Sequence, residues 1–128
     1  MPRTPPALLR RLLLAAAVTG LGPVVSASAA DLTFDLEVVR GKVPPNMRVI
    51  RVKQSDVVRL RWRTDQPLTL HLHGYDIELA LDRGAVGEMT FTARATGRFP
   101  VNVHEGNADA GGHSHQETPL VFIEVYPQ

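Results

Sequence analysis

The stretch LHLHGYD, residues 70–76, determines how the rest of the chain is interpreted. In a β-strand alternate side chains share a face, so His71 and His73 are predicted to point one way while Leu70 and Leu72 point the other way. The glycine that follows gives the backbone the freedom to turn. Two imidazoles on one strand face are typical of half a metal site. The alternative is that both are polar residues on a solvated face.

The other three histidines of the chain lie together further on, at His104, His113 and His115. The candidate metal ligands are therefore His71, His73 and His104, with His113 or His115 closing the site. The segment around His113 is glycine-rich and is either a flap that delivers a ligand or a surface loop whose histidines contact nothing. Histidine donors supported by carboxylates suit Cu(II), Zn(II) or Ni(II), whereas Cu(I) prefers sulfur. Three carboxylates are predicted to orient the imidazoles: Asp76, Glu105 and Glu117.

Residues 1–30 are predicted to be a secretory signal peptide. Three arginines precede an apolar run over residues 12–25, and the small residues 27–30 offer a cleavage site before Ala30 or Asp31. The apolar run is too short and too broken by glycine and proline for a spanning helix. We therefore expect an exported bacterial protein, periplasmic or secreted, with no stable membrane insertion once the signal is cleaved.

The remaining residues, 31–128, are predicted to form one domain. Removal of the signal takes three of the 14 basic residues and none of the 13 acidic ones, which leaves a net charge of about −2. That balance argues against binding to nucleic acid. The chain contains no cysteine, so it has neither a disulfide nor a thiolate metal ligand.

Short runs with alternating apolar residues, separated by glycine, proline and aspartate, predict an all-β domain of seven to eight strands. The spacing favours a Greek-key β-sandwich. Trp62 shares a predicted strand face with Val58 and Leu60, so we expect it in the core. The predicted strands cover approximately residues 32–38, 47–53, 58–63, 70–73, 77–81, 89–94, 99–103 and 120–126.

The order of these features resembles a cupredoxin-like domain over nearly the whole of residues 31–128. The parallels are a break over residues 38–45, a hairpin at residues 53–56, the histidine-containing strand, a strand opened by residues 97–99, and the last strand at residues 120–126. The resemblance implies a cupredoxin-type Greek-key sandwich. The His-x-His-Gly stretch also resembles a copper motif of the multidomain multicopper oxidases.

The resemblance implies copper, but not a blue-copper site. In blue-copper cupredoxins a cysteine thiolate joins two histidines, and the position that corresponds to this cysteine holds Val103. What carries over is one upstream histidine, His71 or His73, and a downstream one, from His104, His113 or His115. Without the copper–sulfur bond the electron-carrier role of the family is not implied.

The sequence thus predicts an exported cupredoxin-like protein, not an enzyme, that binds or carries copper as Cu(II), or another divalent metal such as zinc. One alternative is a metal-free interaction domain that binds another exported protein through its basic face or its histidine loop. A second is a small copper redox enzyme or a subunit of one. The basic face is predicted on one hairpin, either as a dock or as a solvated surface paired with neighbouring acidic residues: Arg51, Lys53, Arg59, Arg61 and Arg63.

Overall fold

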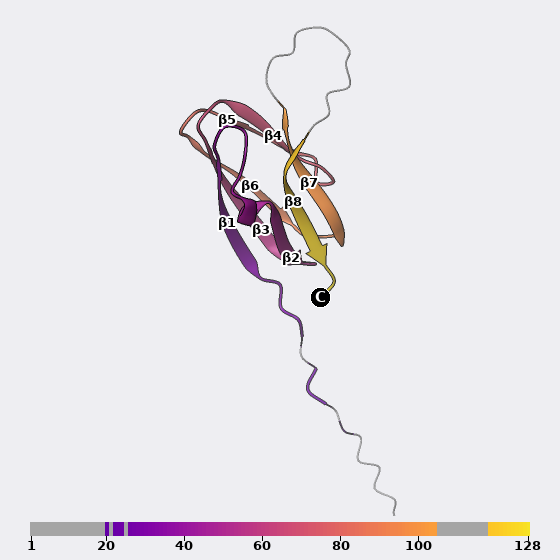
Figure 1. The fold of residues 1–128 in the computed structure, drawn as a ribbon. Helices are drawn as coiled ribbons and strands as arrows, with labels where there is room; N and C mark the ends of the chain where they lie inside the picture. Colours follow the sequence, from indigo (N-terminus) through magenta and orange to yellow (C-terminus); the bar gives the residue numbers. More distant parts are fainter. Residues whose placement is uncertain (1–19, 21, 25, 105–117) are drawn as a thin grey trace, which may run out of the picture.

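A computed structural model describes residues 20, 22–24, 26–104 and 118–128, in which the predicted strands are present (Figure 1). A single 3-10 turn, η1 (Pro45–Met47), precedes the second strand where proline breaks the strand pattern. The strands are β1 (Asp31–Val38), β2 (Val49–Lys53), β3 (Val57–Thr64), β4 (Leu68–Leu72), β5 (Ile77–Leu81), β6 (Val86–Thr92), β7 (Gly97–His104) and β8 (Pro119–Tyr126).

The strands form two sheets that face one another. The first sheet has the order β1-β3-β6 and the second has the order β2-β8-β7-β4-β5. Two pairings are parallel, β1 with β3 and β2 with β8, and the others are antiparallel. The prediction of an all-β sandwich of seven to eight strands is therefore confirmed for the described residues.

The core lies between the sheets and is built by the alternating residues that the sequence pattern indicated. Trp62 and Leu60 of β3 are fully buried, as are Leu70 and Leu72 of β4. Their strand neighbours are partly or fully exposed, as expected for strands that are buried on one face. The prediction that Trp62 is a core residue is confirmed.

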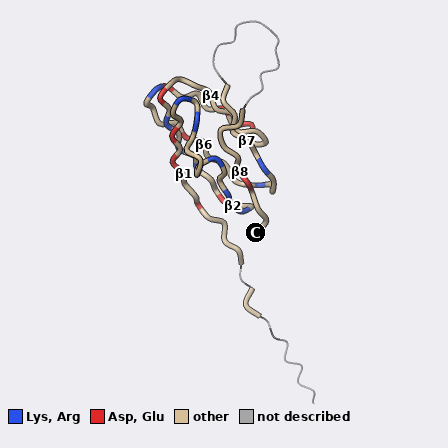
Figure 2. The backbone as a smooth tube through the Cα atoms, in the orientation of Figure 1, with Lys and Arg blue, Asp and Glu red and all other residues tan. Residues whose placement is uncertain are grey.

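The prediction of one continuous basic face is wrong, because β2 and β3 belong to different sheets. The turn at residues 54–56 carries the chain from one sheet to the other, so Arg51 and Lys53 lie apart from the three arginines of β3. Two of the three β3 arginines also form ion pairs with acidic residues. Arg59 Nε lies 2.9 Å from Glu88 Oε1, and Arg61 pairs with Asp35. Figure 2 shows basic and acidic positions interspersed along the strands.

Candidate metal centre

The hairpin of β4 and β5 brings a histidine and a glutamate together. In its register His71 lies directly opposite Glu78, and residues directly opposite one another in an antiparallel pair share a face. Because Leu70 and Leu72 point into the core, His71 and Glu78 lie on the outer face of the five-stranded sheet.

Strand β7 supplies a second histidine to this face. Leu70 pairs with Val103 and Thr69 pairs with His104, so Val103 points inward and His104 points outward, to the same side as His71. The ring centroids of His71 and His104 are 5.5 Å apart. His104 therefore reaches the candidate site from a regular strand, because the site lies on the outer face of the sheet.

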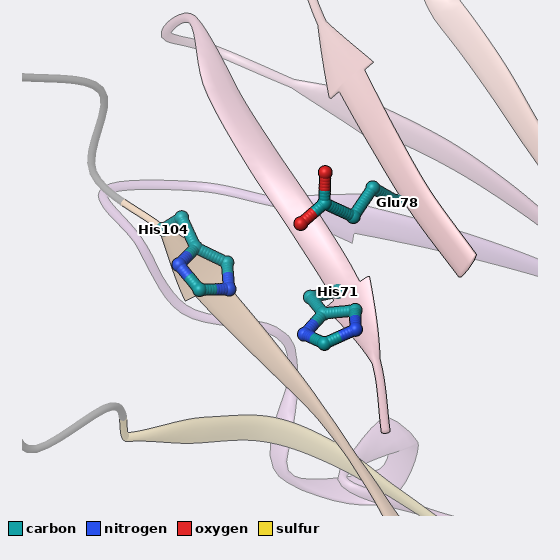
Figure 3. A group of neighbouring side chains, drawn as sticks. All are labelled: His71, Glu78 and His104. Carbon is teal, nitrogen blue, oxygen red and sulfur yellow. The ribbon is translucent and has the colours of Figure 1, made fainter. Parts of the chain in front are cut away.

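His71, Glu78 and His104 form the one group among the described residues with the donor spacing of a metal site. One donor atom from each lies within 4.8 Å of the others, and Figure 3 shows the three side chains side by side on adjacent strands. Donors on opposite sides of a first-row divalent ion are at most about 4.2 Å apart. The spacing of the three donors is therefore close to that required by a single ion.

The burial of the three residues also suits a metal site. His71 is largely covered, with 18% of its side chain exposed, and His104 is half-buried, whereas Glu78 is exposed. Two nitrogens and a carboxylate oxygen are donors that Cu(II) and Zn(II) accept. The residues present thus fit such an ion, with access from solvent on the side of Glu78.

His73 lies just beyond β4, at the start of the turn, rather than inside the strand as predicted. Its backbone N–H donates to the carbonyl of Pro100 at 3.0 Å, and its ring centroid is 4.2 Å from that of His71. Its Nε2 lies 3.1 Å from Nδ2 of Asn102. His73 therefore adjoins the cluster, and its Nε2 contacts the side-chain amide of Asn102.

Asn102 lies directly opposite His71 in the regular β4–β7 pairing, on the outer face of the sheet. The pairing of β7 with β8 is irregular at this point, because Val101 lies opposite Val121 and Asn102 lies opposite Pro119, so that β8 carries one extra residue. Asn102 is only 6% exposed although it lies on the outer side of the sheet. The turn also depends on Gly74, whose φ of +85° favours glycine.

Of the three carboxylates predicted to orient imidazoles, Asp76 is placed to do so. Its Oδ1 lies 3.5 Å from Nε2 of His71. A carboxylate beside an imidazole is the kind of group that orients a metal-binding histidine. Glu105, Glu117, His113 and His115 lie outside the described residues.

Glu78 was missed as a candidate ligand by the sequence analysis, although a signal for it exists. The segment that joins Leu72 to Ile77 has four residues, and closing a hairpin there places His71 opposite Glu78. Counting across the turn would therefore have found it. The alternation pattern alone shows only that Glu78 is on a solvated face.

No model of a known protein family matches the sequence, and no curated protein matches it significantly. Solved structures do match the fold. A multi-copper oxidase from Pseudomonas thermotolerans aligns with a TM-score of 0.56 and 21% identity over 78% of this chain and 30% of the oxidase. An apo copper-binding protein determined by NMR aligns with a TM-score of 0.56 and 14% identity over 78% of this chain and 92% of its own.

The periplasmic domain of cytochrome oxidase subunit II (CoxB) from Bradyrhizobium japonicum also aligns, with a TM-score of 0.56 and 18% identity over 75% of this chain and 84% of that domain. The chain spans less than half the length of several of the oxidases that it matches. These likenesses define the fold: the protein is a cupredoxin-like β-sandwich. Within the described residues no helix has the length and apolarity needed to cross a membrane.

Proposed function

We propose that the protein is an exported Cu(II)-binding or copper-carrying domain whose ligands include His71, His104 and Glu78. The observation that carries the proposal is the convergence of these three donors, from three adjacent strands, on one face of a cupredoxin-like sandwich. His73 adjoins them, and the predicted ligands His113 and His115 follow β7 in the sequence. The copper-binding protein and the oxidase domain of like fold support copper as the ion.

The proposed site differs from a blue-copper site. Val103, at the position of the family cysteine, pairs with buried Leu70 and packs against the core. A side chain there points away from the face on which His71 and His104 lie. Nitrogen and oxygen donors therefore make up the site, and the role we propose is binding or carriage of the metal rather than blue-copper electron transfer.

Cu(II) titration by calorimetry on the exported protein tests the donor set. Replacing His71 or His104 with Ala should weaken binding at least about tenfold, because losing even a group that supports a ligand often costs that much. Glu78→Gln should also weaken it, whereas Glu37→Gln, an exposed glutamate of β1 in the other sheet, should not. Unchanged affinity in the His71, His104 and Glu78 variants would contradict the proposed site.

Spectroscopy of the loaded protein tests the class of site. The Cu(II) form should be pale, with an electron-spin signal of nitrogen and oxygen ligation, since no thiolate is available. An intense blue charge-transfer band would contradict this assignment. If no metal is bound at all, the metal-free interaction domain becomes the better interpretation.

A further inference from the structure

Ala30 is the residue at which the described chain first becomes tied to the sandwich. Its N–H donates to Oδ1 of Asp56 at 2.9 Å, and its carbonyl accepts from Val57 N–H at 2.8 Å. The bond to Val57 begins the ladder in which Asp31 lies opposite Val57. The described residues before Ala30 are all exposed, and none of them hydrogen-bonds to the described part of the sandwich.

Asp56 is a buried acceptor at this point. It is 5% exposed, and its Oδ2 accepts the N–H of Lys53 at 2.8 Å across the turn. Among the described residues, the donor to its Oδ1 is Ala30. A buried carboxylate oxygen that loses its donor is costly to the folded state. The geometry therefore requires a donor at the position of the Ala30 nitrogen.

We propose that the signal peptide is cleaved between Ala29 and Ala30, and that the new α-ammonium of Ala30 binds the carboxylate of Asp56. The signal peptidase of the export machinery would add water across this peptide bond. The carbon–nitrogen bond breaks, the carboxylate of Ala29 leaves with the signal, and the amine of Ala30 takes up a proton. An ammonium donates more strongly to a carboxylate than an amide does.

The sequence also allows cleavage of the peptide bond between Ala30 and Asp31, and the structure distinguishes the two cleavage positions. Cleavage there would remove both hydrogen bonds of Ala30 and leave Oδ1 of Asp56 without its donor. Cleavage one residue earlier keeps both bonds and adds a charge. Ala27 and Ala29 provide the small residues that a signal peptidase requires before the bond.

This inference rests on the export step of the proposed function but not on copper, so loss of the metal site alone would leave it standing. The turn that contains Asp56 lies at the end of the sandwich where β8 finishes, since Gln54 N–H donates to the carbonyl of Tyr126. His104 is the last residue of β7, which ends where β8 begins, at the opposite end of the β7–β8 pair. Failure of the metal site therefore does not affect the cleavage proposal, and the calorimetric titration distinguishes the two outcomes.

The first experiment is expression of the full chain in a bacterial host, with intact mass and N-terminal sequencing of the periplasmic protein. We expect Ala30 as the first residue. A protein that begins at Asp31, or that keeps any residue before Ala30, overturns the proposed cleavage position.

The second experiment tests the ammonium itself. Thermal unfolding is compared for the processed protein, which begins at Ala30, and for a version that keeps Ala29. In the version that keeps Ala29 the charge lies one residue away from Asp56. Its melting temperature should therefore be lower, by about 4–8 °C, the shift that a small domain shows when it loses one charge-assisted hydrogen bond. Asp56→Asn should then lower the melting temperature more in the Ala30 protein than in the longer one. Equal melting temperatures for the two unsubstituted proteins overturn the docking, even if the Asp56 variants fail to fold.

Discussion

Gly74 shows at the scale of one residue how the turn beside the candidate site is held. Its φ is +85°, and a Cβ added to it would lie 2.5 Å from Cδ1 of Phe99. Gly84 has a similar φ of +75°, but a Cβ there would meet nothing within 4 Å. The two glycines therefore separate the cost of the backbone conformation from the cost of the close approach.

We predict that Gly74→Ala destabilises the protein more than Gly84→Ala. A side chain in the left-handed region costs about 1–2 kcal/mol at either position, and overpacking against Phe99 should add about 1–3 kcal/mol at residue 74 alone. Urea unfolding of both variants measures the difference. Equal losses would mean that the ring of Phe99 moves aside freely.

Trp62 is the largest fully buried side chain among the described residues. We predict that Trp62→Ala lowers the free energy of unfolding by about 3–5 kcal/mol, as aromatic truncation in a core does. Trp62→Phe should cost less, since it keeps an aromatic ring and removes an indole N–H that has no hydrogen-bond partner among the described residues. A loss of at most about 0.5 kcal/mol for Trp62→Ala, typical of a surface change, would contradict its role in the core.

At the scale of the element, β3 combines a buried face with a face of paired charges. Arg59 bonds Glu88 across to β6, but about half of each side chain is exposed to solvent, 49% and 46% respectively. Exposed ion pairs of this kind contribute about 0–1 kcal/mol. The stability of β3 should therefore come from its inward residues, such as Leu60.

We predict that Arg59→Ala costs no more than about 1 kcal/mol and that added salt reduces this cost further. Leu60→Ala, one residue along the same strand, should cost about 2–5 kcal/mol. Denaturant unfolding at low and high ionic strength checks both values. A larger loss for the arginine would contradict the assignment of the stability of β3 to its inward residues.

The elements themselves could be predicted from the sequence, whereas their assignment to sheets could not. Alternation gave the strands and their inward faces, including that of Trp62, because one buried face imposes a period of two. It could not show that β2 and β3 lie in different sheets, since both parallel pairings join segments distant in sequence. The predicted basic face failed for this reason.

The candidate site was predicted in part. His71 and His104 were identified by residue type, and the structure places them on one face. Glu78 required the register of the β4–β5 hairpin, and the position of His73 required the exact end of β4. Neither of these follows from alternation. The role of the loop histidines, His113 and His115, stays a prediction.

At the scale of the whole molecule, the last strand of the chain completes the larger sheet. Strand β8, the last of the chain, lies between β2 and β7 and pairs with β2 in parallel. β2 therefore has no partner in its sheet until β8 is in place. The five-stranded sheet, and with it the support for the candidate metal centre, is completed by the C-terminal segment.

This late pairing sets a kinetic property of the protein. Non-local contacts slow folding, and all-β sandwiches typically refold in milliseconds to seconds rather than microseconds. We predict refolding in that range after a stopped-flow dilution from urea, followed through the fluorescence of Trp62, with microsecond refolding as the contradicting result. A chain that cannot complete its larger sheet until its last strand is present remains unfolded for longer, which is consistent with the export that we propose.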